Sequence, residues 1–298
     1  MAPPGGTQGG EAGEPVHTVL TVLRGAEAWF ERRGIEAPRR SAELLLGKVL
    51  GLDRLHLYLA HDRPLDEKER AAMRDLVARR GRGEPVAYLI GTWAFRGLEL
   101  AVAPAVLIPR PETEELVDHA LARLPAGGRV VDLGTGSGAI AIAIAVERSD
   151  AHVVAVDQSR NALVVAEANA ARHGVSDRVT FLHGSWWEPV PAGMDFDLVV
   201  SNPPYIDPSA PTGLAPDVAA HEPPLALYSA PGDPASCYRA IVAALHERLR
   251  VGGSIVVETG LGASDAALAL FRTQPCLADA SLVADAGGAP RFVLARRT

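Results

Sequence analysis

One stretch sets the architecture of this chain: residues Val130–Gly138, with the sequence VVDLGTGSG. Its first half has the apolar composition of a buried strand, and a helix-length segment begins at Ile140. Glycine backbones accept positive φ values and let a ligand approach closely, while free N–H groups at a helix N-terminus favour electronegative ligand atoms. The stretch therefore predicts a strand, a ligand-binding turn and a helix within a parallel α/β sheet.

An acidic residue at the end of the next predicted strand strengthens the prediction of a binding site. Asp157 closes the run His152–Asp157 and follows Gly134 by twenty-three residues. A carboxylate at this place can accept hydrogen bonds from both hydroxyls of a ribose. Because Gly134-x-Gly136-x-x-Ala139 also fits a relaxed dinucleotide fingerprint, NAD is an alternative ligand at this stage. Tight strand–helix packing without any ligand is the other alternative.

Strand-like and helix-length segments alternate after this unit, which predicts an α/β fold with a doubly wound, mostly parallel sheet. The expected strands are Val130–Leu133, His152–Asp157, Val179–Leu182, Phe196–Ser201 and Ser254–Glu258. The expected helices are Ile140–Glu147, Asn161–His173, Ala235–Arg248 and Ser264–Phe271. Two final runs, Ser281–Asp285 and Arg291–Ala295, are expected to form an antiparallel C-terminal hairpin.

The segments before the sheet have a different character. Apolar residues recur at helical spacing from Val16 to Arg80, which predicts a small helical bundle. Between Pro85 and Val106, short aromatic and aliphatic runs are broken by glycine and proline, which predicts a β-hairpin. We therefore expect a disordered tail at residues 1–14, a helical domain at 15–82, a β-hairpin linker at 83–106 and the α/β domain at 107–298.

The predicted strand Phe196–Ser201 runs into the tetrapeptide Asn202-Pro203-Pro204-Tyr205. Two consecutive prolines restrict the backbone, so a stiff turn holds Asn202 at the carboxyl edge of the sheet. The Asn202 side-chain oxygen and the Pro203 carbonyl can each accept one N–H of a planar NH₂ group. Both acceptors bind more strongly as positive charge develops on that nitrogen, and Tyr205 offers a flat face that excludes water.

This loop predicts methylation of a weakly nucleophilic amide or amine nitrogen. Such a nitrogen needs directed hydrogen bonds and close placement against the methyl donor more than it needs a strong base. The alternative is a proline-stiffened turn in which Asn202 only caps the backbone.

Composition restricts the class of protein. A hydrophobic fraction of 48% and a charged fraction of 22% are typical of a folded globular protein. The two cysteines, Cys237 and Cys276, form no Cys-x-x-Cys pair, and no histidine spacing predicts a metal site. The sequence shows neither a secretory signal nor a run of eighteen apolar residues, so we expect a cytoplasmic protein without a membrane partner.

Charge is spread unevenly along the chain, whose net charge is −7. Residues 106–298 hold fourteen Lys or Arg against twenty-two Asp or Glu, whereas residues 15–105 hold fifteen against twelve. Proteins that grip nucleic acids usually present a basic face. The acidic larger part therefore argues against a direct nucleic-acid partner.

Taken together, the motifs resemble a known family. Val130–Gly138, Asp157 and the Asn-Pro-Pro-Tyr tetrapeptide look like a class I methyltransferase that methylates amino groups. Upstream, Glu84–Gly91 (EPVAYLIG) and Leu107–Leu116 (LIPRPETEEL) resemble the release factor glutamine methyltransferases of the HemK/PrmC type. The resemblance covers all but the ends of the chain.

The resemblance implies a class I methyltransferase fold, S-adenosylmethionine as cofactor, and N5-methylation of the glutamine in the Gly-Gly-Gln loop of peptide chain release factors. It places the cofactor against Gly134, Thr135, Gly136, Ser137, Gly138, Asp157, Trp186 and Asn202. It places the glutamine against Asn202, Pro203, Pro204 and Tyr205, with Asn202 and Pro203 as the catalytic pair.

Two departures from the family pattern bear on these implications. Ser185 stands where the family commonly has an acid before the aromatic residue, which puts a carboxylate contact to the adenine amino group in doubt. The segment Ser229–Pro234 matches the family's Gly/Asp-rich stretch less closely.

The motif Pro109–Glu115 has two possible roles, since it either caps a helix or lines the pocket.

Other acceptors and another class stay open at this stage. The same loop suits a ribosomal-protein glutamine or an exocyclic amine of a nucleic-acid base, and the glycine turn alone suits an NAD-dependent oxidoreductase or a nucleotide-sensing module. We expect a monomer whose helical domain, residues 15–82, grips the protein substrate.

Overall fold

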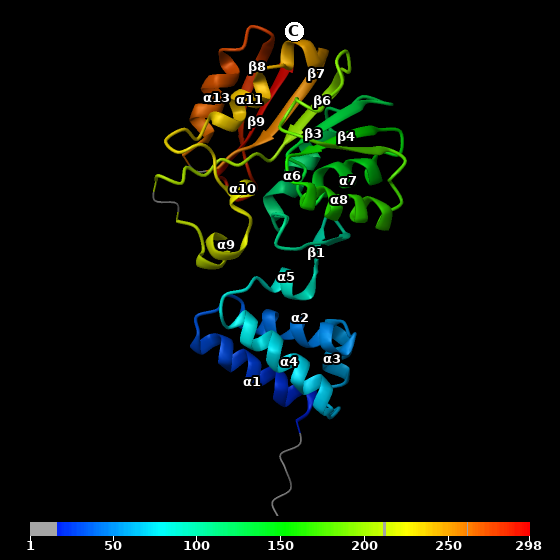
Figure 1. Cartoon of the computed structure of the whole chain (residues 1–298), viewed down its shortest axis with the longest axis vertical. Helices are drawn as coiled ribbons and strands as arrows, with labels where there is room; N and C mark the ends of the chain where they lie inside the picture. The colour runs from blue at the N-terminus through cyan, green and yellow to red at the C-terminus, as the bar shows by residue number, and fades with distance from the viewer. Residues whose placement is uncertain (1–16, 211–212, 261) are drawn as a thin grey trace, which may run out of the picture. The chain divides into compact units, whose positions relative to one another are not determined.

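The computed structural model describes residues 17–210, 213–260 and 262–298, so the predicted tail at 1–14 lies outside the described residues. The chain divides into two compact units, Met1–Leu89 and Ile90–Thr298, each described by itself below (Figure 1). The finer boundaries expected from the sequence, at 82/83 and 106/107, stay predictions.

The first unit is helical. Its main helices are α1 (Val19–Arg32), α2 (Pro38–Leu50), α3 (Arg54–Leu59) and α4 (Glu67–Arg80). The side chains of Thr18, Asp53 and Asp66 accept backbone N–H groups at the starts of α1, α3 and α4, which satisfies donors that a helix leaves open. Phe30 and Leu45 are fully buried between these helices, so the helical periodicity of the sequence is confirmed.

The segment between Pro85 and Val106 is a hairpin only in part. Strands β1 (Thr92–Phe95) and β2 (Leu98–Ala101) pair antiparallel. Arg96 and Gly97 both have positive φ, at 49° and 74°, as a two-residue hairpin turn of this twist requires.

The residues just before this hairpin correct the sequence interpretation, since helix α5 (Val86–Ile90) occupies the start of the segment that the sequence predicts to be a β-hairpin. The Pro85 carbonyl accepts N–H groups from Tyr88 and Leu89 and starts this helix. A short run that is apolar on every side shows neither strand nor helix periodicity, which explains the error.

A seven-stranded sheet dominates the second unit, with strand order β5-β4-β3-β6-β7-β9-β8. Its strands are β3 (Arg129–Leu133), β4 (His152–Asp157), β5 (Val179–His183), β6 (Phe196–Ser201), β7 (Leu249–Glu258), β8 (Leu277–Ala284) and β9 (Pro290–Arg297). The first five strands of this order are parallel, and β9 pairs antiparallel with both β7 and β8. The doubly wound sheet with an antiparallel C-terminal hairpin is confirmed.

Helices cover both faces of this sheet (Figure 1). They are α6 (Pro111–Leu121), α7 (Ala139–Glu147), α8 (Arg160–Arg172), α11 (Ser236–Val242), α12 (Leu245–Arg248) and α13 (Ser264–Arg272). Two short helices, α9 (Pro216–His221) and α10 (Pro224–Leu227), lie in the connection between β6 and α11. The single helix expected over Ala235–Arg248 is wrong. Ala244 leaves helical geometry at φ −115° and ψ 9°, and the chain resumes as α12 with Leu245 fully buried.

Alternate residues of each strand enter two separate cores. Val130 and Leu198 face the core that α6, α7 and α8 cover, whereas Val131 and Val199 face the core that α11, α12 and α13 cover. Burial on both faces explains the nearly continuous apolar runs of these parallel strands. Among the described residues, no helix is long and apolar enough to cross a membrane.

Strand order places the two informative motifs together. The chain runs outward from β3 through β4 to β5 and then returns to place β6 on the other side of β3. The carboxyl ends of β3 and β6 therefore lie side by side at the point where the strand order reverses. Open α/β sheets bind ligands at this point.

Candidate functional site

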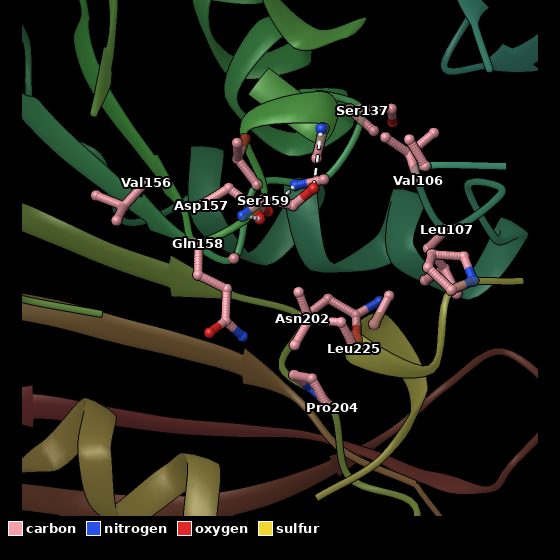
Figure 2. A pocket seen from close by; sticks show the side chains of 18 of the residues that line it. Val106, Leu107, Ser137, Val156, Asp157, Gln158, Ser159, Asn202, Pro204 and Leu225 are labelled. Carbon is pink, nitrogen blue, oxygen red and sulfur yellow. Dashed lines mark hydrogen bonds between the residues drawn. The ribbon is translucent and has the colours of Figure 1, made fainter. Parts of the chain in front are cut away.

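A cavity lies at the carboxyl edge of β3, β4 and β6, entirely within the second unit. Residues from the stretches 105–113, 134–140, 156–162, 184–186 and 223–226 line it, together with Asn202 and Pro204. Figure 2 shows Asp157 and Ser159 above Asn202 and Pro204 in that view. The cavity thus brings the glycine-rich turn and the tetrapeptide to one site.

The glycine-rich turn adopts the backbone that its sequence predicts. Gly134, Gly136 and Gly138 have φ values of 81°, 56° and 82°, a region that side chains disfavour. Apart from atoms of the adjacent residues in the chain, no atom of the described residues lies within 4 Å of where a Cβ on Gly134 or Gly136 would stand, so their backbone faces open space. A Cβ on Gly138 would lie 2.7 Å from Ile142 Cδ1, which shows that this third glycine is needed for packing.

Asp157 is held in place by backbone donors. Its Oδ2 accepts the Gly136 N–H at 2.8 Å, and its Oδ1 accepts the Ser159 N–H at 2.8 Å. Burial raises the pKa of Asp157, while these backbone N–H groups oppose the rise. Each carboxylate oxygen keeps a second lone pair, so the oriented group can accept the two hydroxyls of a ribose.

Asp132 supports the turn from beneath. It is fully buried, and its Oδ2 accepts the Thr135 hydroxyl at 2.6 Å. Burial raises the pKa of Asp132 to about 7. Asp132, on strand β3, therefore helps to position the glycine-rich turn through Thr135.

The two tryptophans after β5 separate in the structure. Trp186 and its neighbour Ser185 both line the cavity, and Trp186 has a positive φ of 48°. Trp187 is buried in the core, where its Nε1 donates to the Ile241 carbonyl at 2.8 Å. Trp186 is thus the indole that can contact a ligand, and no carboxylate stands at position 185.

The tetrapeptide contributes unevenly to the cavity wall. Asn202 and Pro204 line it, whereas Pro203 and Tyr205 are outside its lining. The Tyr205 ring packs against Gly260, where a Cβ would lie 2.3 Å from Tyr205 Cε2. Burial raises the pKa of Tyr205 to about 12, so its hydroxyl stays neutral. This ring braces the loop from behind in the present structure.

A buried chain of side chains holds the Asn202 amide. Its Nδ2 donates to Thr113 Oγ1 at 3.2 Å, and the Thr113 hydroxyl donates to Glu258 Oε2 at 2.7 Å. Thr113 is 4% exposed and Glu258 is 2% exposed. Because the amide nitrogen is engaged on this side, the amide oxygen is the atom available to a ligand.

The motif Pro109–Glu115 serves both roles that its sequence allowed. Pro111 starts α6 and Glu112 lies in the first turn, as helix capping predicts. Pro109 and Thr113 nevertheless line the cavity. Residues Pro109–Glu115 therefore both start helix α6 and form part of the cavity lining.

Two further residues that sequence reasoning missed fasten the wall. Glu222, 3% exposed, accepts the Ile108 N–H at 3.1 Å and pairs with Arg110 at 2.5 Å. Asn169 is fully buried; it accepts the Ala101 N–H at 2.7 Å and donates to the Ser137 carbonyl at 2.9 Å. Neither contact has a local signal, because the partners are 32 to 114 residues away in the sequence.

The donor set fits S-adenosylmethionine. The open glycine backbone, the oriented carboxylate of Asp157 and the indole of Trp186 suit the amino-acid, ribose and adenine parts of such a ligand. No group of three or more His, Cys, Asp or Glu side chains is placed to hold a metal ion in the part of the chain that the structure describes.

Comparisons with known proteins agree with this geometry. Residues 21–91 match the family model of the PrmC N-terminal domain, and residues 112–219 match that of the methyltransferase small domain. The chain is 43% identical to a release factor glutamine methyltransferase of Geobacter sulfurreducens, over 93% of this chain and 96% of that protein. It is 44% identical to one of Chlorobaculum tepidum, over 82% of this chain and 86% of that protein.

A solved structure shares the fold. The hMettl16 catalytic domain, in complex with a MAT2A 3′UTR hairpin, aligns with a TM-score of 0.51 at 18% identity, over 67% of this chain and 76% of that chain. At this identity the likeness concerns the methyltransferase fold alone.

Proposed function

This chain belongs to the release factor glutamine methyltransferase family, and from that premise we infer that it transfers the methyl group of S-adenosylmethionine to the side-chain amide nitrogen of a release-factor glutamine. The acceptor is the glutamine of the Gly-Gly-Gln motif. The observation that carries this inference is the Asn202 amide, whose nitrogen is engaged by Thr113 and whose oxygen is left for the substrate.

The proposed mechanism rests on placement and directed hydrogen bonds. Bound S-adenosylmethionine supplies an electrophilic methyl group. Asn202 Oδ1 and the Pro203 carbonyl each accept one N–H of the glutamine amide and so direct the nitrogen toward that methyl group. As the N–C bond forms and the S–C bond to the methyl carbon breaks, the nitrogen gains positive charge and both oxygens bind its hydrogens more strongly, which lowers the barrier selectively. The products would be S-adenosylhomocysteine and the N-methylated amide, which loses one N–H proton to solvent.

The remaining roles follow the same division. We propose that Gly134, Thr135, Gly136, Ser137, Gly138, Asp157, Trp186 and Asn202 hold the cofactor, and that Asn202, Pro203, Pro204 and Tyr205 receive the glutamine. Tyr205 would act by bracing the loop against Gly260 until the substrate is bound.

We propose that the helical unit binds the body of the release factor. Helix α3 exposes Leu55 and Leu59 by 64% and 68%, so it offers apolar surface that the unit itself does not cover. Leu55→Glu with Leu59→Glu should raise KM for the release factor and leave cofactor affinity unchanged. An unchanged KM would count against this role. We also propose that the enzyme is a monomer and acts in the cytoplasm, where release factors act.

The test is methyl transfer to an intact release factor. Radiolabelled S-adenosylmethionine should label the factor once, on the Gly-Gly-Gln glutamine as located by tandem mass spectrometry. A factor in which glutamate replaces this glutamine is the matched control, since it keeps the shape and lacks the NH₂ group. Label on the control factor, or on a ribosomal-protein glutamine or a nucleic-acid base instead, would refute the assignment.

Calorimetry distinguishes a methyltransferase from the alternative of an NAD-dependent oxidoreductase. S-adenosylhomocysteine, the expected product, should bind, and NAD should not. Tighter binding of NAD than of S-adenosylhomocysteine would refute the proposal of methyl transfer.

A further inference from the structure

The chain of hydrogen bonds behind Asn202 contains two buried polar residues to which the proposed mechanism gives no role. Thr113 lies in the first turn of α6, and Glu258 is the last residue of β7. Both are almost completely buried, and the Glu258 carboxylate interacts with the Asn202 amide as well as with the Thr113 hydroxyl. Burial of a carboxyl group is costly, so its place directly behind the reacting loop calls for an explanation.

The direction of this chain follows from what each group can donate. An ionised carboxylate only accepts, so the Thr113 hydroxyl has to give its single hydrogen to Glu258. The Thr113 oxygen can then only accept from Asn202, and an amide can satisfy that only through its NH₂ end. With Glu258 as the fixed acceptor, the Asn202 amide therefore has one orientation, in which Oδ1 faces the cavity.

The opposite orientation would oppose catalysis. An Asn202 amide turned by 180° would present its NH₂ group to the NH₂ group of the substrate. Two donors repel each other, and the positive charge that develops on the substrate nitrogen would meet a positive dipole end.

We propose that Thr113 and Glu258 are positioning residues that determine which end of the Asn202 amide faces the acceptor nitrogen. This inference rests on the proposed function, because it assigns the substrate-facing atom of that same site. In this role the two residues act only through Asn202.

Neighbouring groups keep Glu258 in place. The Tyr238 hydroxyl donates to the Glu258 backbone carbonyl at 3.1 Å. The backbone that carries the Glu258 side chain is thus held by Tyr238 of α11. Burial raises the pKa of the Glu258 carboxyl, and Glu112 on α6 adds to this rise, whereas the Thr113 hydroxyl and Arg291 on β9 favour the ionised form.

Three variants of the full-length chain test the proposal. Glu258→Gln keeps the size of the side chain but adds an NH₂ donor, which lets the Thr113 hydroxyl donate to Asn202 and turn its amide. Thr113→Val keeps the shape and removes the hydroxyl, whereas Thr113→Ser retains it. Glu167→Gln, an exposed carboxyl on α8, is the matched control for the charge change.

The readouts are kcat on the release factor, the Kd of S-adenosylhomocysteine, and the melting temperature. We expect Glu258→Gln and Thr113→Val to lower kcat by about 10–100-fold, which is less than the roughly 10²–10³-fold found when a transition-state hydrogen bond is removed, because the Asn202 oxygen is turned and not deleted. The Kd should stay within about twofold, Thr113→Ser should recover most of the lost kcat, and Glu167→Gln should match the unaltered chain.

Other outcomes overturn the proposal. A kcat within about twofold of the unaltered chain in both Glu258→Gln and Thr113→Val would refute it, as would a Thr113→Ser variant as slow as Thr113→Val. If Glu258→Gln melts too low to assay, the Thr113→Val and Thr113→Ser pair decides. Failure of the unaltered chain to methylate the release factor refutes the proposed function itself, so the two failures are distinguishable.

Discussion

The two walls of the cavity are built by different means. The wall proposed for the cofactor is held by backbone groups and near neighbours: Asp157 accepts the N–H of Gly136, twenty-one residues away and within one strand–helix–strand unit. The wall proposed for the acceptor is held by side chains from distant parts of the chain, with Asn202 and Thr113 separated by 89 residues and Thr113 and Glu258 by 145. Contacts between residues that are close in the sequence can be recognised from a motif. Contacts between distant residues form only when the whole sheet has folded.

This difference predicts separable defects. Changes on the acceptor side should lower kcat with little effect on cofactor binding, and changes on the cofactor side should do the reverse. The following experiments are ordered by the size of the expected effect.

The largest effect is expected from Asn202→Ala. This change removes one of two transition-state acceptors, and we expect kcat to fall by about 10²–10³-fold, as for loss of one oxyanion-type hydrogen bond. Single-turnover assays on the release factor measure the step. Asn202 is also expected to touch the cofactor. If the change lowers only cofactor affinity and leaves kcat intact at saturation, Asn202 binds the cofactor and does not act on the glutamine.

The reverse pattern is expected from Asp157→Ala. Loss of hydrogen bonds from a charged acceptor should weaken S-adenosylhomocysteine binding by about 10–100-fold. At saturating cofactor, kcat should return close to its original value. Calorimetry gives the Kd, and Glu167→Gln again serves as the control for a lost carboxylate. An unchanged Kd would mean that Asp157 only holds the N–H groups of Gly136 and Ser159.

The pH dependence probes the acceptor wall in the unaltered chain. Burial raises the pKa of Glu258 to about 7, and the charged or titratable groups that face it are Glu112, Tyr205, Tyr238 and Arg291. The proposed orientation needs the ionised form, so activity should rise as pH increases through the pKa, by about tenfold between pH 6 and 8.

Two controls isolate this titration from that of Asp132, which lies beneath the cofactor turn and has its pKa raised to about 7. Saturating S-adenosylmethionine removes the effect of cofactor affinity, and Glu258→Gln should show a low and flat profile. A Glu258→Gln profile that keeps the same rise would assign the titration to another group.

The smallest effect is expected from Glu222→Gln. The amide still accepts the Ile108 N–H but loses the charge that pairs with Arg110, a loss of about 1 kcal/mol that corresponds to roughly fivefold. We expect this as a rise in KM for the release factor, because the cavity wall loosens. Steady-state kinetics measure it, and a kcat effect larger than that of Asn202→Ala would contradict the ranking.

The same contrast explains what could be predicted from the sequence. Strands β4 and β6 were located to the residue, because each is an apolar run with clear ends. The glycine turn, Asp157 and Asn202 were placed at one site because each follows a strand. The exceptions include α5, whose apolar run has no period, and the break between α11 and α12 at Ala244, which follows from core packing. Strands β7 and β8 begin at Leu249 and Leu277, before the expected Ser254 and Ser281, and the short helices α9 and α10 are not expected from the sequence.

The supporting residues of the site were not predictable in this way. Thr113, Glu222 and Glu258 are ordinary polar residues in the sequence, and their partners are 89 to 145 residues distant. Asn169 likewise looks like a surface residue of α8 until the sheet brings Ala101 to it. Their roles depend on tertiary contacts that no local pattern records.

The most direct test is a crystal structure of the chain with S-adenosylhomocysteine and a Gly-Gly-Gln peptide. The glutamine Nε2 should lie at about 2.7–3.2 Å from both Asn202 Oδ1 and the Pro203 carbonyl, with the sulfur of the product in line behind it. A glutamine bound elsewhere, or an Asn202 amide whose Nδ2 faces the glutamine nitrogen, would contradict the assignment of the acceptor wall.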